Sequence, residues 1–169
     1  MNTPHTVPAS FVAFSFAPEH IALLTGEGAS RQTHQLPLSL SQVVQMFGQR
    51  MPNALQLENA IAEVEDAIMP AGKLLPHTAQ VLLTTEPLLL QLIQSATGQL
   101  QTQSKTQPAT QSAAREALET LFSALAQQAQ NGATARQIPQ NPEAAAALLI
   151  LRECMHHWGL LELRYQPHA

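Results

Sequence analysis

Residues 141–169 read NPEAAAALLILRECMHHWGLLELRYQPHA, and the rest of the predicted fold can be worked out from them. Asn141 is a favoured residue for capping a helix N-terminus, and proline at the next position already has a helical φ. Gly159 suits the left-handed residue that follows the end of a helix. The sequence therefore predicts a helix that begins directly after Asn141 and ends at Gly159. Because residues 144–151 are apolar all round, we expect this helix to be buried.

A β-strand is predicted directly after this helix, at residues 160–165, because apolar and polar side chains alternate there. Three further strands are predicted near the N-terminus, at residues 11–16, 21–25 and 31–36, with turn-forming residues between them. Consecutive strands with short turns form an antiparallel meander. We expect the C-terminal strand to join that meander, so that both ends of the chain share one small sheet.

Helical periodicity and helix-end signals predict about five helices in all, the C-terminal helix included. They cover residues 38–49, 53–68, 85–97, 112–131 and 142–158. The apolar stretch at residues 79–83 fits either a short strand or a loop beside a helix. Residues 99–111 are rich in Gln, Thr and Ser without apolar periodicity, which predicts a flexible loop. We therefore predict a single α+β domain over residues 1–169. Its small antiparallel sheet combines the N-terminal meander with the C-terminal strand and packs against the helices.

The composition argues against several classes of partner. Charged residues make up 12% of the chain and the net charge is −4, so there is no basic patch for nucleic acid or an anionic membrane. A weakly charged surface favours self-association, which predicts a homo-oligomer. Cys154 is the only cysteine, which fits a reducing compartment, and the N-terminal residues lack the pattern of an export signal. We expect a cytoplasmic protein.

The most specific polar pattern is formed by Glu153, His156 and His157. Spacings of three and four residues allow Glu153 to meet either histidine on one helix face. Glu-x-x-His is one quarter of a di-iron carboxylate site, but a second copy and the His-Glu-x-x-His motif of zinc proteases are both missing. We therefore predict no metal and no cofactor, with the histidines complementing the helix C-terminus at the border of an interface. Metal binding, acid–base catalysis or a pH-sensitive contact are the alternatives.

Two glutamates, the cysteine and the tryptophan are further candidates. Glu58 and Glu65 are seven residues apart on one helix face, largely off its apolar stripe, which indicates a solvated acidic face. Docking of a basic partner or a divalent cation is the alternative for that face. We expect Cys154 to be a buried, inert thiol and Trp158 to be an anchor in the core or in an interface.

The missing catalytic motif, the low charge and the apolar C-terminal helix favour a non-enzymatic accessory or assembly protein. Such a protein would bind another protein, or itself, through apolar surface left by its helices. The alternative is a small metal-dependent or acid–base enzyme that uses Glu153, His156 and His157, with help from Glu58 or Glu65. A third possibility is a sensor that binds a small ligand between sheet and helices.

Overall fold

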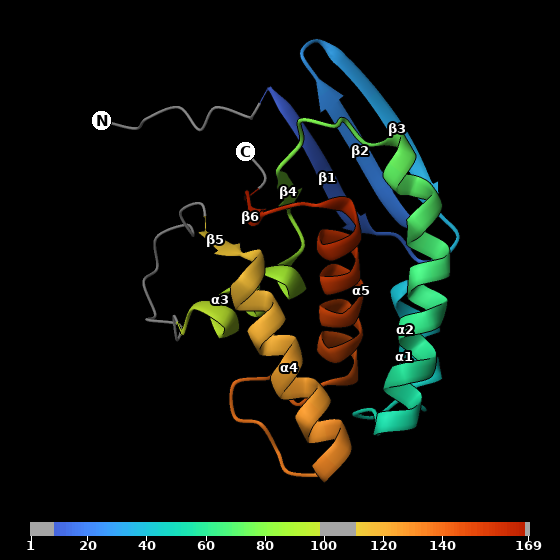
Figure 1. The fold of residues 1–169 in the computed structure, drawn as a ribbon, viewed down its shortest axis with the longest axis vertical. Coiled ribbons are helices and arrows are strands. Elements are labelled where there is room, and N and C mark those ends of the chain that lie inside the picture. The colour runs from blue at the N-terminus through green and yellow to red at the C-terminus, as the bar shows by residue number, and fades with distance from the viewer. Residues whose placement is uncertain (1–8, 99–110, 168–169) are drawn as a thin grey trace.

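The computed structural model describes residues 9–98 and 111–167. In these residues, six strands form one mixed sheet with the order β3-β2-β1-β4-β6-β5 (Figure 1). The strands are β1 (Ser10–Phe16), β2 (Ile21–Glu27), β3 (Ser30–Leu36), β4 (Val81–Thr84), β5 (Gln111–Ala114) and β6 (Glu162–Tyr165).

The same residues form five α-helices and one short 3₁₀ helix. They are α1 (Leu40–Met46), α2 (Ala54–Ile68), η1 (Met69–Leu74), α3 (Pro87–Thr97), α4 (Arg115–Asn131) and α5 (Pro142–Trp158). Figure 1 shows α5 in the middle of the helical layer, and α1, α2, α3 and α4 all pack against it. None of the described helices combines the length and apolar character needed to cross a membrane.

The signals at the ends of α5 correctly predicted its bounds. The Asn141 side chain accepts a hydrogen bond from the backbone N–H of Glu143 at 2.8 Å, and Gly159 has a φ of 68°. Each residue from 144 to 151 is fully buried, as the unbroken apolar run requires. Burying so long a run gives α5 a large share of the hydrophobic stabilisation, which grows by about 25 cal/mol per Å² of apolar surface buried.

The α+β class is confirmed, but the prediction of a small antiparallel sheet was wrong. β6 does not pair with the N-terminal meander, because β4 lies between them and pairs in parallel with both β1 and β6. Parallel neighbours need long crossover connections, and here the helices between the strands supply them. Residues 79–83, which fitted either a short strand or a loop, thus contribute to β4, a central strand of the sheet. Its Leu82, Leu83 and Thr84 are buried.

A second correction concerns β5. Residues 111–114 were predicted to end a flexible loop and begin a helix, but they form an edge strand antiparallel to β6. The small residues of β5 carry no periodic pattern, so the strand owes its conformation to pairing with β6. The helix then begins at Arg115. The rest of the predicted loop, residues 99–110, lies outside the described residues.

The sheet contributes one face to the core. The buried strand residues of the core come from alternate positions, which point to the same side of a sheet. They include Val12, Phe14, Ile21, Leu23, Leu82 and Leu163. The helices pack on this face. Because α5 leads directly into β6, its C-terminal end lies at the edge where β6 starts. Its N-terminal end lies at the edge where the parallel strands finish.

Candidate functional site

The most unusual side chain in the described structure is Glu153 on α5. Its side chain is 0% exposed, although carboxylates are almost never fully buried unless they are paired. Arg152 Nη1 donates a hydrogen bond to Glu153 Oε1 at 2.6 Å. The other oxygen, Oε2, is buried and has no hydrogen-bond partner among the described residues. A buried acceptor left without a partner costs roughly 1–3 kcal/mol, and more when it is charged.

His157 lies one turn further along α5 and faces this oxygen. Its Nε2 is 3.4 Å from Glu153 Oε2 and 3.2 Å from Oε1 of Glu65 on α2. One ligand atom from each of the three residues lies within 4.8 Å of the other two. The His157 side chain is 26% exposed, so one side of this group is open to solvent. We call Glu65, Glu153 and His157 the α2–α5 cluster.

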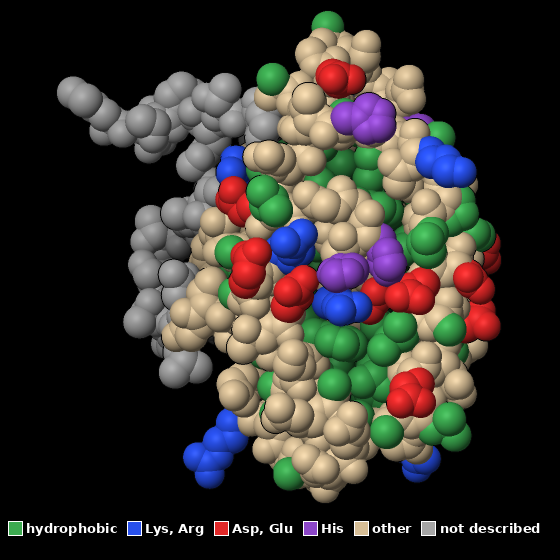
Figure 2. Space-filling view, in the orientation of Figure 1, with side chains coloured by type: hydrophobic (Ala, Val, Ile, Leu, Met, Phe, Trp, Pro, Cys, Tyr) green, Lys and Arg blue, Asp and Glu red, His purple; other side chains and the backbone are tan. Residues whose placement is uncertain are grey.

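Of the three residues predicted as one polar group, the structure keeps Glu153 and His157 together and places His156 apart from them. His156 points to a different neighbour, with its Nδ1 3.5 Å from Glu119 Oε1 on α4. Adjacent residues of a helix are about 100° apart around its axis, which explains why the two histidines diverge. Figure 2 shows histidine side chains in the middle of this face, with acidic and basic side chains around them.

The acidic pair on α2 also separates. Glu58 is exposed and takes no part in the cluster, whereas Glu65 is half-buried and contacts His157. Trp158 closes the same junction, because its indole Nε1 donates to the carbonyl oxygen of Ile68 at 3.1 Å. The C-terminal ends of α2 and α5 are thus joined by two polar contacts side by side.

Two contributing residues were not singled out from the sequence, Arg152 and Glu119. Arg152 lies with its guanidinium carbon 5.4 Å from the centre of the Phe122 ring. This contact places the cation so that it holds one oxygen of Glu153. An arginine next to a glutamate in a helix is common, so no sequence pattern distinguishes this role.

The thiol of Cys154 is not available as an ionised ligand. Burial raises its pKa well above the ordinary value, and the neighbouring charge of Glu153 raises it further. The thiol is fully buried, as predicted. It therefore stays protonated, and the chemistry of this region rests on two carboxylates and one imidazole.

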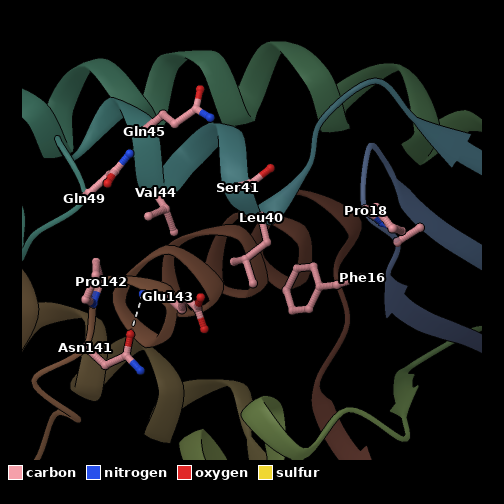
Figure 3. A pocket seen from close by; sticks show the side chains of 11 residues that line it. Phe16, Pro18, Leu40, Ser41, Val44, Gln45, Gln49, Asn141, Pro142 and Glu143 are labelled. Carbon is pink, nitrogen blue, oxygen red and sulfur yellow. Dashed lines mark hydrogen bonds between the residues drawn. The ribbon is translucent and has the colours of Figure 1, made fainter.

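A cavity of about 700 Å³ opens at the other end of α5 (Figure 3). It lies beside the end of β1, between the β1–β2 turn, α1 and the first turn of α5. Its lining residues are Phe16, Ala17, Pro18, Leu40, Ser41, Val44, Gln45, Gln49, Asn141, Pro142 and Glu143. No residue of this cavity was a candidate in the sequence.

Comparison with known proteins found similarity in structure alone. No protein-family model and no curated protein sequence matches this chain. A solved structure of the Aquifex aeolicus PPX-GPPA enzyme aligns with a TM-score of 0.73 at 10% identity, over 95% of this chain and 54% of that one. An exopolyphosphatase-like protein aligns with a TM-score of 0.69 at 12% identity, over 99% and 59%. An exopolyphosphatase from Cytophaga hutchinsonii gives 0.69 at 8% identity, over 95% and 54%.

These structures are named as Ppx/GppA or exopolyphosphatase proteins, so the prediction of a non-enzymatic accessory or assembly protein is contradicted. At such low identity the similarity establishes the fold, and one fold can carry many functions. This chain spans little more than half the length of the structures it matches.

Proposed function

We propose that the protein is a metal-dependent hydrolase in which the α2–α5 cluster binds a divalent transition-metal ion. The observation that carries this proposal is the fully buried Glu153 carboxylate, whose Oε2 lacks a hydrogen bond and faces His157 Nε2 at 3.4 Å. A cation at that point would supply the missing partner of the oxygen. It would also place a positive charge beside Glu65, whereas Glu153 already pairs with Arg152.

Two of the three ligand–ligand distances in the cluster suit such an ion. Zinc binds nitrogen and carboxylate oxygen at about 2.0–2.2 Å, so the ligand atoms of a tetrahedral site lie about 3.3 Å apart. His157 Nε2 is 3.2 Å from the Glu65 oxygen and 3.4 Å from the Glu153 oxygen. One imidazole with two carboxylates also suits manganese or iron. Magnesium and calcium prefer ligand sets made of oxygen alone, which this site does not offer.

The chain's own residues would then have distinct tasks. Glu65, Glu153 and His157 would bind the ion, and Arg152 would orient Glu153 by holding its other oxygen. Three protein ligands leave a coordination position for water, and zinc in such sites lowers the pKa of bound water to about 7. The exposed edge of His157 is where water and substrate would approach.

We propose a phosphate ester or phosphoanhydride as the substrate class. The support is the fold shared with proteins named as phosphatases and exopolyphosphatases. The chain carries a net charge of −4, so an anionic substrate would need a local source of positive charge. A metal ion at the α2–α5 cluster would provide it.

A hydrolysis assay tests this function. Metal-free protein should be supplied with zinc, manganese or magnesium and assayed with p-nitrophenyl phosphate and with inorganic polyphosphate. We expect activity with a transition metal, and a loss of at least about 100-fold in kcat/KM for His157→Gln. His156→Gln is the matched control and should retain activity. Hydrolysis that survives both chelation and His157→Gln would contradict the proposal.

A further inference from the structure

The cavity in Figure 3 is a second place where a ligand could bind, and it is separate from the α2–α5 cluster. Glu143 and Glu153 are ten positions apart on α5, which corresponds to about 15 Å along the helix axis. The cavity lies beside the carboxyl end of β1, where β1 runs parallel to β4. Ligands of open α/β sheets bind outside the carboxyl ends of the strands.

The wall of the cavity is mostly apolar. Figure 3 shows the side chains of Phe16, Leu40 and Val44 directed into the space between α1 and α5. At about 700 Å³, the cavity falls in the range of small-molecule sites, which is about 300–1,000 Å³. A ligand that fills it must therefore carry an apolar group.

The polar part of the lining determines the charge of the ligand. Among the described residues that line the cavity, Glu143 alone carries a charge. A helix N-terminus normally favours an anion, but the first turn of α5 has few donors to offer. Pro142 has no N–H, and the N–H of Glu143 is already bonded to the Asn141 side chain at 2.8 Å. The Glu143 carboxylate would thus repel an anion, and few free N–H groups are present to offset that repulsion.

We infer that this cavity binds a small organic ammonium ion with an apolar tail. The ammonium group would pair with the Glu143 carboxylate, and the tail would pack against Phe16, Leu40 and Val44. The amide side chains at the rim, including Gln45 and Gln49, can accept further N–H groups. This inference does not depend on the proposed hydrolase activity, since the two sites share no residue.

Three probes of equal length test the inference on the full chain. Hexylamine, hexanol and hexanoate differ only in their head group, and their binding can be followed by calorimetry or by NMR shifts. We expect hexylamine to bind at least tenfold more tightly than hexanoate, with hexanol between them. Glu143→Gln should remove most of the preference for the amine while hexanol binds as before.

Two further variants test the charge and the apolar wall separately. Glu58→Gln removes an exposed carboxylate from α2 and should leave the preference intact. Leu40→Asn changes the apolar wall and should weaken the amine and the alcohol alike. Equal binding of hexylamine and hexanoate would overturn the inference. So would an unchanged preference in Glu143→Gln, or no binding of any probe at millimolar concentration.

Discussion

The Oε2 atom of Glu153 faces Nε2 of His157 at 3.4 Å across one turn of α5, and it does so from a carboxylate that is 0% exposed. The second carboxylate at the same nitrogen comes from Glu65, 92 positions away in the sequence. Two acidic groups thus converge on one imidazole at the junction of two helices. Arg152 pairs with one oxygen of Glu153, but the other oxygen is buried without a hydrogen bond among the described residues, which gives the first prediction its unusual sign.

We expect Glu153→Gln to leave the stability of the metal-free protein unchanged or to raise it. Replacing the buried charge removes a desolvation cost, and the amide oxygen can still accept the Arg152 hydrogen bond. Arg152 loses its ion-pair partner, but its side chain is 26% exposed, so water can solvate the guanidinium. The free energy of unfolding in urea should therefore change by between zero and about +2 kcal/mol. A loss of more than about 3 kcal/mol would mean that the carboxylate is needed for the fold itself.

The two glutamates of α2 should respond differently to substitution. An ion at a concentration 100 times its Kd stabilises the folded state by about 2.7 kcal/mol. We expect Glu65→Gln to lose most of the thermal shift that zinc or manganese produces. Glu58→Gln, on the same helix but exposed, should keep all of it. Equal shifts in both variants would exclude Glu65 as a ligand.

The buried thiol of Cys154 should make stability fall at high pH. Its pKa in the folded protein is raised above the ordinary value of 9.0 by burial and by Glu153, so the unfolded chain loses this proton first. The stability that the protonated thiol contributes is present below pH 9.0 and is lost as the pH rises from there towards the folded pKa. The slope is about 1.4 kcal/mol per pH unit.

Cys154→Ala should remove that slope. Urea unfolding of both proteins between pH 8 and pH 10.5 would give the difference, since other titrating groups are common to the two. Parallel stability curves would show that the thiol ionises equally well in the folded and unfolded chains.

Trp158 should contribute to the junction of α2 and α5 through its indole N–H. In Trp158→Phe an aromatic ring is kept, although a smaller one, but the hydrogen bond to the carbonyl oxygen of Ile68 is lost. We expect the free energy of unfolding to fall by roughly 1–2 kcal/mol, measured by circular dichroism in urea. A change smaller than about 0.3 kcal/mol would show that solvent replaces the bond at no cost.

Local signals in the sequence predicted the elements better than their arrangement. The ends of α5 follow from Asn141 and Gly159, because capping and left-handed backbone depend on a few neighbouring residues. The central position of β4 depends on pairing with β1 and β6, which no local pattern reveals. β5 was missed for the same reason, since residues 111–114 become a strand only beside β6.

The candidate site was predictable in part. The spacing of Glu153 and His157 places both on one side of a helix, and the structure keeps them within 3.4 Å. The choice between Glu58 and Glu65, and between His156 and His157, depends on how α2 and α4 pack against α5. Such packing is a tertiary property. The sequence therefore predicts which residue types form the site, but not which glutamate and which histidine contact each other.

The most direct test of the central claim is the metal content and ligand set of the purified protein. After exposure to zinc and exhaustive dialysis, elemental analysis should find one ion per chain. X-ray absorption spectroscopy should find one imidazole nitrogen and carboxylate oxygens at about 2.0–2.2 Å around it. His157→Gln should lose the ion, whereas His156→Gln should keep it. A protein that retains no stoichiometric ion, or one that binds it equally well without His157, would contradict the account.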